Sequence, residues 1–465
     1  MSTTLTYLNT YGSGTAAFYT KAPATDARTS THFIALIDIS ESMADKSKLV
    51  HVKHCMRLLL TFLTSDDALS LVTFGEDSEI VLNRVQTSSN HIPSIEKAIS
   101  SLRVDGCTNY SSGLASVRQI LKEATEANCT LKPGLLSFTD GHANRGAHRV
   151  TELNSMVCRI HELYPALSFS FVGYGTDHNA DMMKTMADSV MGSYSVVDSL
   201  ESAATAMGDC LGSILSCVAQ NVYLECPLGS SVEGPYIMDP KGRILLGDLY
   251  SGTEITILLY LKPGPVTFSG VSLPDLDTFS EVVVTTLDTS QNIAIDVTRL
   301  RYRCSELFHQ IREQFVLNSD TRLREEIMQF RESIRRPELV GHPVIAVLES
   351  EVNSMLAALE IIRSGGMYTS GLHTQLTQHA AFTANMRGTT TSILPEVPRG
   401  RVRFNSAASD PDHAEPSAAP SATPSATPSA VPAPHIVMSP MSSTRQRNVT
   451  EQMRAASIGG GDPRS

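Results

Sequence analysis

The sequence lacks any long apolar run. No stretch reaches the roughly 18 consecutive apolar residues that a membrane-spanning helix needs, so we expect no membrane insertion. Residues 1–20 have neither the basic start nor the apolar core of a secretory signal peptide. These two absences predict a soluble, intracellular protein that resides in the cytoplasm.

Basic residues and paired cysteines are also scarce. The chain has 37 Lys and Arg residues against 48 Asp and Glu residues, a net charge of −11. Nucleic acids and anionic membranes bind clustered Lys and Arg, so we expect neither as a partner. The eight cysteines include no Cys-x-x-Cys pair and no His at zinc spacing. Most of them, such as Cys55 and Cys158, are predicted to be reduced residues on apolar helix faces.

One short apolar run ends at a cluster of oxygen-bearing side chains. Residues 33–37, Phe-Ile-Ala-Leu-Ile, show no polar alternation, which is typical of a strand buried on both faces of a parallel sheet. Asp38, Ser40 and Ser42 follow this strand, at the edge where open α/β sheets place their ligand sites. A carboxylate and two hydroxyls suit a hard divalent cation, Mg²⁺ first. A loop that merely caps a helix is the alternative, because Asp and Ser are preferred capping residues.

Two further segments complete a recognisable pattern. Residues 106–109 read Gly-Cys-Thr-Asn, and residues 137–141 read Ser-Phe-Thr-Asp-Gly after a second apolar run. With Asp-x-Ser-x-Ser at 38–42, and in this order, they resemble the metal-ion-dependent adhesion site of von Willebrand factor A (VWA) domains of the intracellular type. The resemblance runs from about Thr31 to about Val218.

The resemblance implies a ligand set and a partner. Ser40, Ser42 and Thr108 would bind the metal directly, and Asp38 and Asp140 would act mostly through bound waters. The expected ion is Mg²⁺, with Mn²⁺ or Ca²⁺ as alternatives. Neutral hydroxyls leave the ion electrophilic, so its open position favours an Asp or Glu carboxylate of a partner protein.

Residues near this site allow two smaller predictions. Glu41 stands where many relatives carry Gly, and we expect its side chain to point into solvent. Three histidines near the presumed site are expected to be exposed loop residues and not ligands: His142, His148 and His178.

Two other function classes compete with an interaction module. In an enzyme, Asp38 would be the nucleophile of a Mg²⁺-dependent phosphotransferase, but Ser40 stands where such enzymes carry their general acid. The sequence also has no phosphate-binding Gly-x-x-x-x-Gly-Lys-Ser/Thr loop and no Gly-x-Ser-x-Gly elbow.

The domain order resembles that of plant RING-type ligases with VWA modules, yet no Cys/His array is present. An adaptor in ubiquitin transfer would therefore need a separate ligase. We favour a non-enzymatic binding module.

Alternating strand and helix patterns predict a doubly wound, mostly parallel α/β sheet, followed by an antiparallel β-sandwich and a small helical domain. Strands within the first 20 residues are expected to join the sandwich. Four tandem Ser-Ala-x-Pro tetrapeptides at 417–432 predict a disordered C-terminal tail. The predicted divisions are 1–28 (N-terminal strand segment), 29–218 (VWA domain), 219–298 (β-sandwich), 299–364 (helical domain), 365–405 (polar arm) and 406–465 (disordered tail).

Overall fold

The computed structural model describes most of the chain as far as residue 363 and short segments beyond it. The described residues are 5–10, 15–25, 28–175, 178–197, 200–273, 275, 277–287, 293–314, 320–363, 372–373, 375–377, 379–380, 389–391, 436–438, 448 and 451–452. Nearly all of the predicted tail, with its tetrapeptides, and most of the predicted polar arm lie outside these residues.

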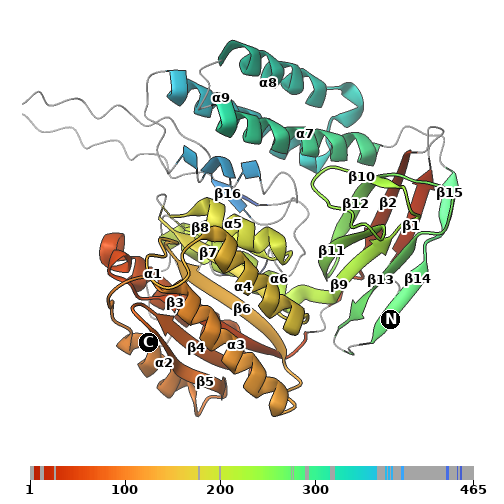
Figure 1. Ribbon diagram of the computed structural model, residues 1–465. Helices are drawn as coiled ribbons and strands as arrows, with labels where there is room; N and C mark the ends of the chain where they lie inside the picture. The colour runs from red at the N-terminus through yellow and green to blue at the C-terminus, as the bar shows by residue number, and fades with distance from the viewer. Residues whose placement is uncertain are drawn as a thin grey trace, which may run out of the picture.

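A six-stranded sheet forms the centre of the α/β unit (Figure 1), with the order β5-β4-β3-β6-β7-β8. Its strands are β3 (Thr31–Asp38), β4 (Ala68–Phe74), β5 (Ser78–Gln86), β6 (Lys132–Thr139), β7 (Ser168–Tyr174) and β8 (Ser193–Val197). All neighbours pair in parallel except β5, which runs antiparallel to β4. The predicted mostly parallel sheet is therefore confirmed, with one antiparallel edge.

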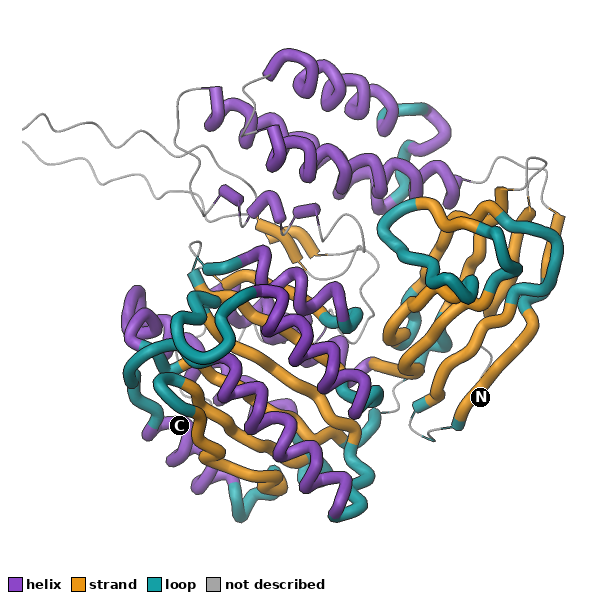
Figure 2. Tube along the Cα trace, viewed as in Figure 1, coloured by secondary structure: helices purple, strands orange, loops and turns teal. Residues whose placement is uncertain are grey.

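Helices cover both faces of this sheet because its central strand is apolar on both faces. Alternate side chains of β3 enter two separate cores, and all eight of its residues are buried. One core also contains side chains of α1 (Lys48–Phe62), α2 (Ile92–Ser101) and α6 (Leu200–Ser216). The other contains side chains of α3 (Tyr110–Glu126), α4 (Val150–Leu163) and α5 (Ala180–Ser189). The sheet consequently lies between two helical layers (Figure 2), and β3 ends at Asp38.

Two further sheets lie beside the α/β unit and share one apolar core. The order of the first is β10-β12-β2-β1-β15, and the order of the second is β11-β9-β13-β14. Their strands are β1 (Leu5–Thr10), β2 (Thr15–Lys21), β9 (Cys217–Glu225), β10 (Ser231–Glu233), β11 (Arg243–Tyr250), β12 (Glu254–Tyr260), β13 (Thr267–Ser272), β14 (Thr278–Val282) and β15 (Thr285–Leu287). The predicted additional antiparallel sheets are confirmed, although β1 and β15 form one parallel pair.

The first two strands pair with strands that follow the α/β unit in the sequence. β2 lies between β12 and β1, and its ladder with β12 spans seven residue pairs, from Thr15↔Tyr260 to Lys21↔Glu254. Phe18 of β2 packs on Phe268 of the second sheet, with ring centroids 5.5 Å apart. The α/β unit is thus inserted in the sequence between two strands of this sheet pair.

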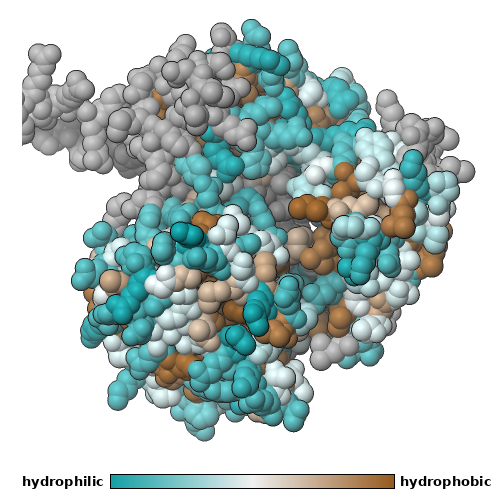
Figure 3. All heavy atoms as spheres, viewed as in Figure 1, coloured by the Kyte–Doolittle hydropathy of each residue, from teal (hydrophilic) through white to brown (hydrophobic). Residues whose placement is uncertain are grey.

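The chain changes sheets between β14 and β15. It leaves β14 at Val282 and enters β15, in the other sheet, at Thr285. Between them, Val283 is buried and its N–H donates to the carbonyl of Val266 at 2.8 Å. Its neighbours Val282 and Val284 are both 68% exposed. Leu228 and Ile237 of the same unit are also exposed, and Figure 3 shows brown side chains on the face of this unit.

The third unit consists of α7 (Ile293–Gln314), α8 (Asp320–Ile334) and α9 (Pro343–Arg363). Their buried side chains form one core, to which Leu372, Leu376 and Ala380 also belong. No helix within the described part of the chain combines the length and the apolar character that a membrane crossing needs.

Ser251 joins the two chain segments that connect the α/β unit to the sheets. Its N–H donates to the carbonyl of Ser216, where α6 ends, at 2.7 Å. Its hydroxyl donates to the carbonyl of Thr25 at 3.0 Å and accepts the N–H of Thr25 at 2.8 Å. The entering and leaving segments are therefore fastened to the same residue.

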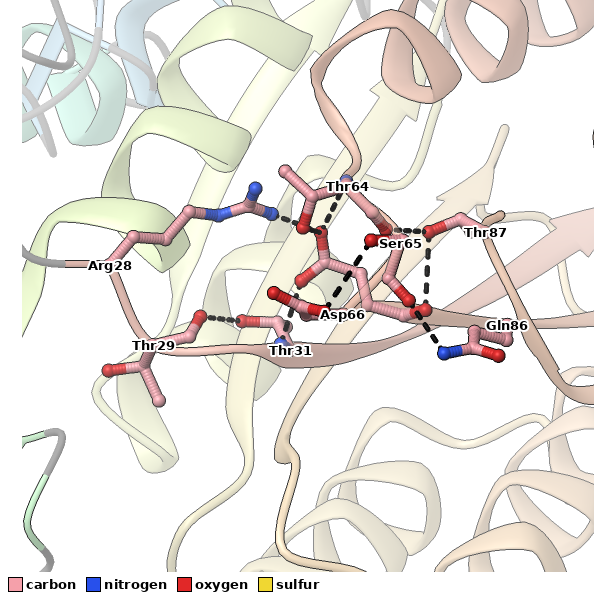
Figure 4. A network of polar contacts seen from close by, with 9 residues as sticks. Arg28, Thr29, Thr31, Thr64, Ser65, Asp66, Gln86 and Thr87 are labelled. Atoms are coloured by element: carbon pink, nitrogen blue, oxygen red, sulfur yellow. Dashed lines mark hydrogen bonds and ion pairs between the residues drawn. The ribbon is translucent and has the colours of Figure 1, made fainter. Parts of the chain in front are cut away.

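A polar network fixes the entering segment to the α/β unit (Figure 4). Asp67, which is fully buried, accepts the N–H groups of Thr31 at 2.9 Å and Thr64 at 2.8 Å. The guanidinium of Arg28 also donates to this carboxylate. The start of β3 is held in this way at the sheet edge opposite to Asp38.

Candidate metal centre

The first loop of the candidate site begins where β3 ends. One oxygen of Asp38 accepts the N–H of Ser40 at 2.9 Å, and the other accepts the hydroxyl of Thr139 at 2.5 Å. The hydroxyls of Ser40 and Ser42 lie 3.1 Å apart. Asp38 is fully buried and Ser40 is 2% exposed, so both belong to the interior of the loop. The chain then turns through a short 3₁₀ helix, Glu41–Ser47, before α1 starts.

The second loop carries Thr108 to the same end of the sheet. The N–H of Glu41 donates to the carbonyl of Gly106 at 3.1 Å, which joins this loop to the first. Gly106 has a φ of +62°, a backbone conformation that favours glycine. Thr108 is 3% exposed, and its N–H donates to the side-chain oxygen of Asn144 at 2.9 Å. Asn109 next to it caps α3 by accepting the N–H of Ser112 at 3.2 Å.

The third loop follows β6 and carries Asp140, which is fully buried. Its Oδ2 accepts the ammonium of Lys48 at 3.0 Å, and its Oδ1 has no hydrogen-bond partner within the described part of the chain. Gly141 beside it has a φ of +74°, and a Cβ there would lie 3.0 Å from the backbone nitrogen of Asn179. This close approach leaves no room for a larger residue after Asp140.

The three loops form a closed ring of contacts. Thr139 binds Asp38, Glu41 binds Gly106, and Asn144, a few residues after Asp140, binds Thr108. The five residues predicted as ligands therefore stand on three loops that are hydrogen-bonded to one another at the carboxyl edge of the sheet.

Burial controls the electrostatics of this site. Removal from water raises the pKa of Asp38 to about 6, because the ionised carboxylate loses its hydration. Hydrogen bonds from Ser40 and Thr139 act in the opposite direction, and the charge of Asp140 adds to the rise. Burial also raises the pKa of Tyr110, whose hydroxyl lies 2.8 Å from that of Ser137 beneath the site.

The donor set fits a hard cation that keeps part of its water. No group of three or more His, Cys, Asp or Glu side chains that could hold a metal occurs among the residues described. The candidate site contains only two acids, so a metal here would need the hydroxyls and water as further ligands, as Mg²⁺ readily accepts. A buried carboxylate oxygen without a partner calls for an explanation, and the free Oδ1 of Asp140 is such an atom.

Two residues that contact the acids of the site were not predicted from the sequence, and one histidine is buried where exposure was predicted. Thr139 and Lys48 contact the two acids, and neither was predicted to do so. The prediction that His178 is an exposed loop residue is wrong: it is 3% exposed, and its Nε2 lies 2.5 Å from the hydroxyl of Tyr194. His142 and His148 are exposed, as predicted, and so is Glu41.

Comparison with known proteins agrees with the fold. The family model described as von Willebrand factor type A domain matches residues 32–196. An uncharacterized protein, YfbK of Escherichia coli K12, is 32% identical over 246 residues, which cover 50% of this chain and 41% of that protein. An uncharacterized protein of Synechocystis, sll0103, is 27% identical over 179 residues, 38% of this chain and 40% of that protein. The matches thus span about two fifths of the length of these two relatives.

A solved structure supports the same fold. A von Willebrand factor type A protein from Catenulispora acidiphila superposes with a TM-score of 0.52 at 14% identity, covering 78% of this chain and 84% of that chain. Residues 32–196 thus match the model of the VWA family, which commonly mediates protein–protein interaction, and the α/β unit has the VWA fold.

Proposed function

We propose that this protein is an interaction module that holds a divalent metal, Mg²⁺ first, at Asp38, Ser40, Ser42, Thr108 and Asp140. The metal would bind an Asp or Glu carboxylate of a partner protein. The observation that carries this proposal is the free, buried Oδ1 of Asp140, on the third of three interlocked loops. Bound there, the ion would supply an electrophilic position for an incoming carboxylate.

The protein's own residues prepare the site for such a ligand. Thr139 and the N–H of Ser40 fix the orientation of the Asp38 carboxylate. Asn144 fixes the backbone of Thr108 and leaves its side-chain hydroxyl available as a ligand. Burial of both acids excludes water around them, which strengthens their interaction with a bound cation.

The same geometry supports a binding module over a phosphotransferase. A nucleophilic carboxylate must reach its substrate, but Asp38 is fully buried and both of its oxygens accept hydrogen bonds. Ser40, in the position of a general acid, is engaged with Ser42. We therefore propose that binding, and no covalent step at Asp38, is the function of this site.

Calorimetric titration with Mg²⁺ tests the ligand set. The double variant Ser42→Ala/Thr108→Val removes two predicted ligand hydroxyls and leaves both acids and their contacts in place. We expect its Mg²⁺ affinity to fall at least about tenfold, a loss of about 1.4 kcal/mol or more in binding free energy. The matched control is Thr125→Val, since Thr125 lies at the far end of α3 and its hydroxyl donates within that helix, to the carbonyl of Leu121 at 2.9 Å.

Two results would contradict the proposal. Equal affinity in the double variant and the control would reject the hydroxyl ligands. Absence of Mg²⁺ or Mn²⁺ binding by the unaltered protein would reject the metal centre itself. The partner's chemistry is tested by competition: free acetate, at concentrations that occupy the open position, should displace partner proteins retained on the immobilised chain in the presence of Mg²⁺.

A further inference from the structure

Lys48 places a buried ammonium group inside the candidate metal centre. Its side chain is 6% exposed, that of Asp140 is 1% exposed, and Nζ lies 3.0 Å from Oδ2. A charged amine is rarely buried without compensation, because burial removes its hydration. Among the described residues, the ion pair between Lys48 and Asp140 is the one that involves an acid of the candidate metal centre.

The loop geometry directs Lys48 to this position. The 3₁₀ helix Glu41–Ser47 follows the Asp38 loop, and Ser47 adopts a left-handed backbone conformation with a φ of 59°. The N–H of Lys48 donates back to the carbonyls of Met43 and Asp45, which fixes the first residue of α1 beside the loop. The lysine is therefore part of the same turn that supplies two of the predicted ligands.

A metal at this centre would share Asp140 with that ammonium. One carboxylate oxygen faces Lys48 and the other is free, so the two cations would lie close together and repel each other. The ammonium also offsets the charge of Asp140 and so weakens its attraction for an incoming ion. Without metal, the same ammonium stabilises a buried carboxylate that would otherwise have no counter-ion.

We propose that Lys48 is a tethered cation that competes with the divalent metal for Asp140 and lowers the metal affinity of the centre. The inference rests on the proposed function, since it presupposes that the centre binds a metal. Lys48 is a positioning residue in this scheme and not a ligand. The centre then exchanges one cation for another, so that partner binding responds to the concentration of free metal.

The test compares Lys48→Gln with Lys122→Gln. Glutamine keeps an N–H donor on a side chain one bond shorter and removes the charge. Lys122 is the matched control because its side chain is 70% exposed on α3, so its change removes the same charge away from the centre. Mg²⁺ affinity is measured by calorimetry, and the melting temperature is measured in a chelator and in saturating Mg²⁺.

Two shifts of opposite sign are expected for Lys48→Gln. Its Mg²⁺ affinity should rise about tenfold or more over that of the control, because the competing charge is gone. Its melting temperature in chelator should fall, whereas the gain on adding Mg²⁺ should exceed that of the control. A merely structural ion pair would lower the melting temperature without raising the affinity.

The outcomes separate this inference from the proposed function. If Lys48→Gln and Lys122→Gln bind Mg²⁺ with affinities within about twofold of each other, the inference is overturned while the metal centre stands. If the unaltered chain and both variants bind neither Mg²⁺ nor Mn²⁺, the proposed function has failed and the inference with it. Should Lys48→Gln not fold, Lys48→Met, which fills the same apolar path, replaces it, and the same affinity comparison decides.

Discussion

His32 gives the α/β unit a dependence on pH that can be calculated from its surroundings. It is the second residue of β3 and is 1% exposed, and its Nε2 lies 2.8 Å from the hydroxyl of Ser70 on the neighbouring strand. Burial lowers its pKa from 6.5 to about 4, and the positive charge of Arg84 acts in the same direction. The folded protein therefore keeps this imidazole neutral down to about pH 4.

The sign of the effect follows from proton uptake. Between pH 6.5 and about 4, His32 is protonated in the unfolded chain but neutral in the folded one. The unfolded state binds more protons there, so the free energy of unfolding falls as the pH falls through this window. At about 1.4 kcal/mol per pH unit, the full contribution is about 3 kcal/mol, present above pH 6.5 and lost by about pH 4.

His32→Gln removes the titrating group and keeps a polar side chain that can reach Ser70. We expect the variant to be less stable than the unaltered protein at pH 7. On going to pH 4, the difference in unfolding free energy between the two proteins should shift by about 3 kcal/mol in favour of the variant. Urea denaturation at several pH values, followed by hydrogen exchange at the amides of β3 and β4, measures this difference within the α/β unit. Parallel loss of stability in the two proteins would show that His32 is not held neutral by burial.

Three other perturbations have defined outcomes. Asp67→Ala leaves buried N–H groups without their acceptor, so the α/β unit should lose about 3 kcal/mol or more in urea denaturation; an unchanged midpoint would contradict the role of its network. Deletion of residues 1–21 removes the strand that pairs with Glu254–Tyr260, so amides there should exchange rapidly while Mg²⁺ binding is retained; undiminished protection would refute the pairing. Gly113→Ala would bring a Cβ within 2.8 Å of Leu36, so the melting temperature should fall by several degrees, and a neutral result would mean that α3 can move away.

The parts of the site that the sequence predicts are those that depend on local pattern. A run of five apolar residues ending at Asp38 defines the buried strand and its carboxyl end, and the loops containing Thr108 and Asp140 follow elements with clear apolar periodicity. Their placement on interlocked loops then follows from the parallel topology. The assignment of the five residues as ligands remains a prediction that metal binding must test.

The parts that sequence reasoning missed depend on contacts between distant segments. His178 is buried because Gly173 lacks a Cβ, which would lie 2.4 Å from the imidazole Nε2. Lys48 reaches Asp140 through the left-handed conformation of Ser47, which no helix periodicity reveals. The passage of the chain from β14 to β15 is not predicted either, because a short apolar run shows neither which sheet it joins nor where the chain changes sheets.

Ser251 has a mechanical consequence under the proposed function, in which a partner would bind at the candidate metal centre of the α/β unit. The entering segment at Thr25 and the leaving segment at Ser216 are both hydrogen-bonded to this residue. A force applied at the candidate metal centre would therefore be shared by the two connecting segments. That force would act on the paired β-strands of the two sheets and on Ser251, and not on a single connecting segment. A partner bound as proposed would therefore keep a fixed orientation to the two sheets, because both connecting segments are held at the same residue.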